Sequence, residues 1–108
     1  MTGLYATISE ATFTSHVITL ARRLGWLAAH FRPGMTKRGR WVTAMSGDVG
    51  FPDCVLIKPG RVIFAELKAA KGRVTPAQRK WLDVAEKAGI EAYLWKPSMI
   101  DEIERILR

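Results

Sequence analysis

Two runs rich in strand-forming residues, 53–58 and 61–68, are joined by a Pro-Gly pair and together predict a β-hairpin. If the turn is tight, the numbers of paired residues sum to 119 along the whole hairpin. Asp53 then lies directly opposite Glu66, with Cβ atoms roughly 4.5–5.5 Å apart. A bulge would shift this register by one residue. The hairpin therefore predicts two neighbouring carboxylates at its open end.

Two like charges that face each other across a hairpin destabilise it unless something compensates them. A divalent cation is the simplest compensation, because hard cations such as Mg²⁺ prefer carboxylate oxygens. Lys68 follows Glu66 by two residues and so points to the same face of the strand. A cation between two carboxylates, with an ammonium beside it, suits phosphodiester hydrolysis. For an isolated E-x-K sequence, a surface ion pair of little energetic value would be the better interpretation.

The positive charge of this 108-residue chain is concentrated in residues 1–80. These hold 13 lysine and arginine residues but four acidic ones, a net charge of +9, whereas residues 81–108 carry −2. The excess points to a polyanionic partner, nucleic acid first and an anionic membrane surface second. We expect no membrane partner, because the first helix carries only two cations, Arg22 and Arg23. The four acids within the basic region are Glu10, Asp48, Asp53 and Glu66.

Composition excludes several other classes of protein. The length suits one domain over residues 1–108, and 48% hydrophobic residues argue for a folded chain. A single cysteine excludes a disulfide framework and fits a reducing compartment. The chain shows no leader segment and no apolar run of the roughly 20 residues that cross a bilayer. We therefore expect a cytoplasmic protein.

The remaining elements alternate between helices and strands and predict one sheet with helices packed on it. Phe13, Val17, Leu20 and Leu24 form one apolar face of the first helix. Before the hairpin we expect a helix from Ser9 to Gly25, a strand at 26–31 and a loop at 32–51. After it we expect a helix from Thr75 to Gly89, a strand at 91–95 and a last helix opened by a Ser98–Asp101 capping box. The helix from Thr75 should bury Trp81, Leu82, Ala85 and Ala88.

Two polar residues lie on otherwise apolar helix faces. Glu10 precedes Phe13 by three residues, and Gln78 precedes Leu82 by four. Glu10 could simply be an acid favoured by the helix dipole, and Gln78 the third residue of a capping box begun by Thr75. Spacing alone favours the capping role for Gln78.

Clustered cations suggest contacts with phosphate groups. Four of them lie in the loop beside Trp41, which could stack on a base, although a solvated loop is the alternative. Two more precede the second helix, where they could hold a phosphate near the metal. The candidate DNA-binding residues are Arg32, Lys37, Arg38, Arg40, Lys71 and Arg73. Asp48 is interpreted as a turn residue. His16, His30 and Cys54 fit no zinc-site spacing.

Three motifs, in order and well spaced, resemble the VRR-NUC domain, the virus-type replication-repair nuclease branch of the PD-(D/E)XK superfamily. They are Gly50-Phe51-Pro52-Asp53, Phe64-Ala65-Glu66-Leu67-Lys68 and Lys71-Gly72-Arg73-Val74-Thr75-Pro76-Ala77-Gln78. Ser9-Glu10 and Glu91-Ala92-Tyr93-Leu94-Trp95-Lys96-Pro97 also look similar. The resemblance implies an α/β, restriction-endonuclease-like αβββαβ core, with a mixed central sheet flanked by helices and a C-terminal helix.

The resemblance also implies a Mg²⁺- or Mn²⁺-dependent phosphodiesterase that acts on DNA. Asp53 and Glu66 match metal ligands, with the Leu67 carbonyl as a possible third ligand. Glu10 matches an acid that completes the metal site or its surroundings, Lys68 the catalytic lysine, and Gln78 a supporting glutamine. Short members of this kind look similar to homodimeric Holliday-junction resolvases, with a bacterial or phage setting.

Three hypotheses follow for the function. The first is a structure-selective endonuclease that resolves four-way or other branched DNA. The second keeps the same chemistry but acts on flaps, nicks or ends. The third is a DNA-binding module without turnover, which would bind with strong salt dependence and give no Mg²⁺-dependent product. The intact set of two acids and a lysine argues against this third hypothesis.

Overall fold

A mixed sheet of four strands forms the centre of the computed structural model, which describes residues 8–31, 34–35, 41–42 and 46–108. The strands stand in the order β1 (Leu27–His30), β4 (Cys54–Lys58), β5 (Arg61–Leu67) and β6 (Glu91–Trp95). The first three are antiparallel neighbours, and β6 runs parallel to β5. This is the mixed-sheet α/β fold that the sequence and the resemblance predicted.

The hairpin register is confirmed at every paired position of β4 and β5. Lys58 faces Arg61 at the turn, and Cys54 faces Ala65 at the last pair before the open end, so the paired numbers sum to 119. Gly60 has a φ of 83°, which a β-carbon would disfavour. The residue pair that follows in this register is Asp53 with Glu66.

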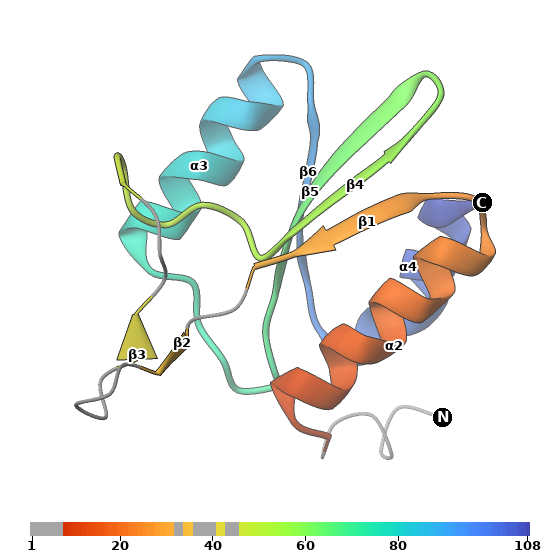
Figure 1. Cartoon of the computed structure of the whole chain (residues 1–108), viewed down its shortest axis with the longest axis horizontal. Coiled ribbons are helices and arrows are strands. Elements are labelled where there is room, and N and C mark those ends of the chain that lie inside the picture. Colours follow the sequence, from red (N-terminus) through yellow and green to blue (C-terminus); the bar gives the residue numbers. More distant parts are fainter. Residues whose placement is uncertain (1–7, 32–33, 36–40, 43–45) are drawn as a thin grey trace.

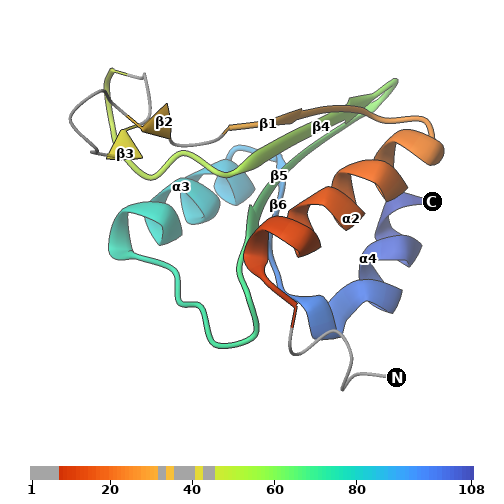
Figure 2. The same cartoon turned by 60° about the horizontal axis from the view of Figure 1, so that its bottom comes forward.

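Helices cover both faces of the sheet (Figures 1 and 2). Helices α2 (Glu10–Arg23) and α4 (Ile100–Leu107) lie on one side of β5 and β6, and α3 (Pro76–Lys87) lies on the other. The core fills the space between the sheet and the α2–α4 pair. Its largest fully buried hydrophobic side chains are Trp95, Phe13, Leu56, Ile63, Leu67, Ile103, Leu107 and Val17.

The helix starts agree with the sequence in two of three cases. The Ser9 hydroxyl accepts from the Thr12 N–H, and Thr75 forms the predicted capping box with Gln78. The Ser98–Asp101 capping box is wrong. A 3₁₀ turn, η1 (Pro97–Met99), precedes α4, and Met99 at its N-cap makes no side-chain capping bond. Because Pro97 fixes its own φ, the chain turns early and Ser98 lies inside the turn.

Two other expectations need correction. The predicted loop 32–51 contains a short antiparallel pair of strands, β2 (Gly34–Met35) and β3 (Trp41–Val42). In α3, Leu82 and Ala85 are buried and Trp81 is half-buried, but Ala88 is exposed because the helix ends at Lys87. Gly89, at a φ of 87°, ends it as predicted.

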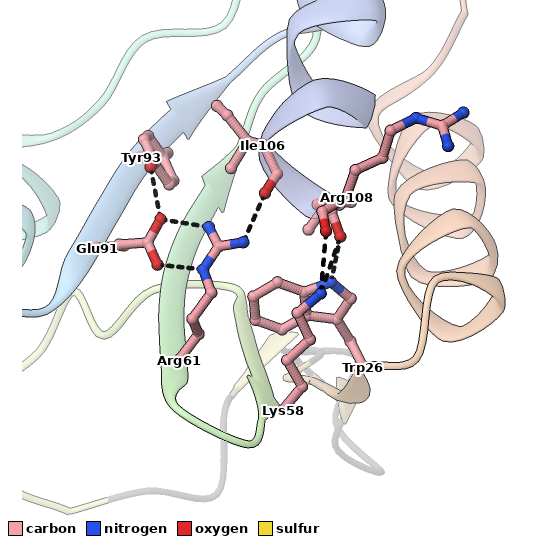
Figure 3. A network of polar contacts seen from close by, with 8 residues as sticks. Trp26, Lys58, Arg61, Glu91, Tyr93, Ile106 and Arg108 are labelled. Carbon is pink, nitrogen blue, oxygen red and sulfur yellow. Dashed lines mark hydrogen bonds and ion pairs between the residues drawn. The ribbon is translucent and has the colours of Figure 1, made fainter.

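Polar contacts hold the closed end of the hairpin against the C-terminal end of α4 (Figure 3). Arg61 forms a two-pronged ion pair with Glu91 and also donates to the Ile106 carbonyl at 2.9 Å. Its guanidinium lowers the pKa of the Glu91 carboxyl. The Trp26 indole donates to the Leu107 carbonyl at 2.8 Å. These contacts tie the turn of the hairpin to the C-terminal end of α4.

The helices of the described residues are too short or too polar for a bilayer crossing. The longest helix that the structure describes, α2, has 14 residues, whereas a transmembrane helix needs roughly 20.

Candidate active site

Asp53 lies at the open end of the hairpin, one residue before β4 begins. Its carboxylate Oδ2 accepts from the Leu67 N–H at 3.0 Å, and its carbonyl accepts from the Phe31 N–H at 2.9 Å. The residue is therefore fixed by both neighbouring strands. The β1–β4 pairing is antiparallel without interruption up to His30 and Cys54. The hydrogen bond from the Phe31 N–H extends this pairing by one residue and so holds the backbone of Asp53 in place.

Glu66 is the one charged residue in the buried class among the described residues, at 1% exposed. Its Oε1 accepts from Gln78 Nε2 at 3.0 Å and lies 3.7 Å from Lys68 Nζ. Its Oε2 is buried and accepts no hydrogen bond from any described residue, so a shared proton with the neighbouring Asp53 carboxyl is the one protein contact open to it. A buried carboxylate oxygen without a partner is costly, so this atom calls for a further ligand.

The surroundings of Glu66 favour its protonated form when no cation is bound. Burial is the largest cause, and the adjacent Asp53 carboxyl adds to it by hydrogen bonding and by charge. The Lys68 ammonium opposes the shift. Together they raise the pKa of Glu66 from 4.5 to about 8. A positive charge at this position would reverse the balance, since it stabilises both carboxylates.

Gln78 makes both contacts that the sequence left as alternatives. Its Oε1 accepts from the Thr75 N–H at 2.9 Å and completes the capping box, while its Nε2 donates to Glu66. The same amide thus ties the first turn of α3 to the buried acid. The Glu66 side chain is oriented by this contact, because it fixes one oxygen and leaves the other free.

Gly50 brings the strand that carries Asp53 close to the start of α3. Its φ is 94°, and a β-carbon built there would lie 2.6 Å from the Ala77 carbonyl carbon and 2.8 Å from the Gln78 nitrogen. Both contacts are with backbone atoms and cannot be relieved by a side-chain rotation. The glycine of the Gly-Phe-Pro-Asp motif is therefore required by a close backbone approach.

Replacing Gly50 by alanine is expected to destabilise the protein well beyond the cost of the backbone conformation alone. Gly47→Ala is a matched control, because Gly47 has a φ of 98° but a β-carbon at this position would meet no atom within 4 Å. We expect about 1–2 kcal/mol of lost stability for Gly47→Ala and several kcal/mol for Gly50→Ala. Urea unfolding of the two variants measures the difference. Equal losses would contradict the close approach.

The other predicted site residues differ in how near they lie to the acids. Lys68 is largely covered, with 15% of its side chain exposed, and Leu67 is fully buried. Lys71 and Arg73 are exposed on the segment between β5 and α3. Lys96 Nζ donates to the Ala70 carbonyl at 3.2 Å and anchors this segment. Arg32, Lys37, Arg38 and Arg40 lie outside the described residues.

Glu10 is exposed in the first turn of α2, which lies beside the end of β5 in both views (Figures 1 and 2). The described residues contain no cluster of three or more His, Cys, Asp or Glu that could hold one metal ion. Glu10 is thus not gathered with Asp53 and Glu66 here, and its part in the site stays a prediction. Asp48 is exposed in a bend, consistent with a turn residue.

The structure does not support a zinc site at His16, His30 and Cys54, which the sequence also disfavoured. Cys54 is fully buried, and burial followed by the charges of Asp53 and Glu66 raises the pKa of its thiol to about 12. A thiol so far from ionisation is a poor metal ligand. His16 is exposed on α2, and His30 is half-buried on β1.

Sequence reasoning missed the contacts that depend on β1 and on the aromatic residues. It did not predict how β1 pairs with β4, and so it missed that Phe31 lies next to Asp53. It also missed the packing of Phe51 against Phe64 and Trp81 under the start of α3. A signal for the position of Phe31 was the strand alternation of Leu27, Ala29 and Phe31, which places these three residues on one face of the sheet.

The residues present fit a bound divalent cation. Two carboxyl groups meet at the open end of the hairpin, and one of their oxygens, Glu66 Oε2, is buried without a partner among the described residues. Carboxylate oxygens are the ligands that Mg²⁺ and Mn²⁺ prefer. This donor set therefore suits a hard cation better than zinc or copper.

Comparison with known protein families identifies a relationship. Residues 32–98, more than half of the chain, match the family model of the VRR-NUC domain. That range includes Asp53, Glu66, Lys68 and Gln78. A comparison with curated proteins finds no match. Domains of this type are nucleases of the PD-(D/E)XK kind, act on DNA and generally use divalent metals. The sequence motifs, the mixed sheet and the family match agree, and the chain belongs to the VRR-NUC family of nucleases.

Proposed function

We propose that the chain is a Mg²⁺- or Mn²⁺-dependent endonuclease that cleaves branched DNA, with the four-way Holliday junction as the favoured substrate. The observation that carries this proposal is the buried Glu66 carboxyl, with its unpartnered Oε2, beside Asp53 and near Lys68. A module that only binds DNA gains nothing from two acids facing a phosphate, because they repel it. The acids are useful where a cation joins them to the substrate.

Asp53 and Glu66 would hold the cation, with the Leu67 carbonyl as a further ligand and Glu10 completing the site or its surroundings. When bound, the cation would supply positive charge to a phosphate oxygen and to the attacking water. Leu67 also contributes through its N–H, which fixes the Asp53 carboxylate. Gln78 keeps Glu66 Oε1 occupied, so Oε2 is the atom left for the cation.

Lys68 would stabilise the negative charge that develops on the phosphate in the transition state. Its ammonium is largely covered and close to Glu66, so its charge is screened less than that of an exposed lysine. Lys71 and Arg73 are exposed on the adjoining segment and would hold the DNA backbone. We assign the same role to Arg32, Lys37, Arg38 and Arg40, which follow β1 in the sequence.

We also propose that residues 1–108 act as one nuclease domain and as a homodimer, since a two-fold junction is engaged most simply by a two-fold pair. An exposed apolar row on the sheet supports self-association. Leu27, Ile57 and Val62 are cross-strand neighbours on β1, β4 and β5, and all three are exposed. The expected setting is the cytoplasm of a bacterial or phage-infected cell.

A panel of labelled substrates tests the proposal. Wild-type protein with Mg²⁺ is expected to cleave a four-way junction faster than a flap, a nicked duplex or a linear duplex of the same sequence, and to give no product in EDTA. The active species is expected to have twice the 12.1 kDa mass of one chain by light scattering. Preference for flaps, nicks or ends would favour the second hypothesis, and binding without any product would favour the third.

A further inference from the structure

One exposed aromatic residue lies in the same row of the sheet as the two acids. The β1–β4 register pairs Leu27 with Ile57 and His30 with Cys54. The next pair in this register is Phe31 with Asp53, and the Phe31 N–H donates to the Asp53 carbonyl at 2.9 Å. Paired residues point to the same face of a sheet. Phe31, Asp53 and Glu66 therefore follow one another across three strands on one face.

The ring of Phe31 packs against one aromatic neighbour among the described residues. It meets Phe51 edge to face, with centroids 5.5 Å apart and planes at 79°. Phe51 in turn packs against Phe64 and Trp81, so this support is anchored to β5 and α3. Yet 45% of Phe31 is exposed. On this face of the sheet, helix α3 lies over β5 and β6 and not over the edge strand β1, whose other face packs against α2 (Figures 1 and 2).

We propose that Phe31 is a stacking platform for a nucleobase next to the cleaved phosphate, and that it favours DNA in which this base is unpaired. The inference rests on the proposed function. Adjacent strands are about 5 Å apart, so a phosphate at Asp53 has its neighbouring nucleotide within reach of the Phe31 ring. Bases in an intact duplex are stacked on each other, whereas those at a branch point can be turned out onto an aromatic ring.

The position of Phe31 distinguishes it from the apolar row further along the sheet. Leu27 opens β1, four residues before Phe31 and on the same face of the sheet, and is 77% exposed. It belongs to the end of the sheet that carries the hairpin turn, because its partner is Ile57. A surface for a second copy of the chain would use Leu27 at least as much as Phe31. A base-stacking role predicts that only Phe31 matters for DNA with unpaired bases.

Binding without cleavage tests this proposal. Two DNAs are compared: a fully paired duplex and the same duplex with unpaired bases at its centre. Fluorescence anisotropy in EDTA would give the affinity of wild type, Phe31→Ala and Leu27→Ala for each of them. Phe31→Ala is expected to weaken binding to the unpaired substrate about 5- to 100-fold and to leave duplex binding unchanged. Leu27→Ala, which lies in the row assigned to the contact between copies, is expected to change the affinities for both DNAs by the same factor, so their ratio stays that of wild type. Phe31→Tyr should restore binding, and Phe31→Leu, which keeps an apolar contact with Phe51, should not.

A fluorescent base analogue at the unpaired position reports the stacking directly. Its emission is expected to change on binding wild type and Phe31→Tyr, but not on binding Phe31→Ala. The proposal would be overturned if Phe31→Ala lost affinity for both DNAs equally, or if Leu27→Ala showed the same selective loss of affinity for the unpaired DNA. A change in solution mass in Phe31→Ala would instead assign the ring to a contact between copies. If junction cleavage by wild type succeeds while these binding differences are absent, only the stacking role fails and the nuclease assignment stands.

Discussion

Glu66→Gln is expected to lower the rate of junction cleavage by about 10²–10³-fold or more. The amide has the same shape as the carboxyl and can still accept from Gln78, so the fold around it should persist. With its oxygen accepting from Gln78, the amide places its nitrogen where the unpartnered Oε2 was, and this nitrogen has no lone pair for a cation. The variant therefore removes the negative charge without creating a cavity. Initial rates on a labelled four-way junction at saturating Mg²⁺ measure the effect.

The same variant separates cation binding from catalysis. Mg²⁺ is expected to raise the melting temperature of wild type, because a ligand that binds only the folded state stabilises it. It should not raise that of Glu66→Gln. Glu86→Gln is the control. Glu86 is exposed on α3, so this variant also loses one negative charge, but at a position distant from Asp53 and Glu66. Equal cleavage rates for wild type and Glu66→Gln would overturn the assigned site.

In the absence of divalent cations, wild type is expected to lose stability relative to Glu66→Gln as the pH rises from about 5 to about 9. The folded state raises the pKa of Glu66 to about 8, mainly through burial and secondarily through Asp53. Between the usual value of 4.5 and about 8, the folded protein binds more protons than the unfolded chain. Stability therefore falls with pH across this window and levels off above it.

The size of this effect follows from the shift in pKa from 4.5 to about 8. One unit corresponds to about 1.4 kcal/mol, so the gap between the two proteins should be small near pH 5 and reach on the order of 5 kcal/mol at pH 9. Urea unfolding in EDTA at several pH values measures it. Glu86→Gln again serves as the control and should follow wild type at every pH. A constant gap between wild type and Glu66→Gln would mean that Glu66 stays ionised in the fold.

The local elements of this protein could be predicted because their signals are short-range. Turn residues set the hairpin register, and the Thr75–Gln78 capping box fixed the start of α3. Local reasoning failed where two local signals competed. Ser98 and Asp101 have capping-box spacing, but Pro97 started a 3₁₀ turn first. It also failed for β2 and β3, since a pair of two-residue strands leaves almost no periodicity to detect.

By itself, the sequence determined that Asp53, Glu66 and Lys68 share one end and one face of a hairpin, because strand alternation and turn length fix both. Only the tertiary structure decided that Glu66 is buried, that Gln78 takes one of its oxygens and leaves the other free, and that Phe31 completes the row. These facts depend on how α3 and β1 pack on the hairpin. Contacts between residues distant in the chain come from the burial of whole surfaces, and no local pattern records them.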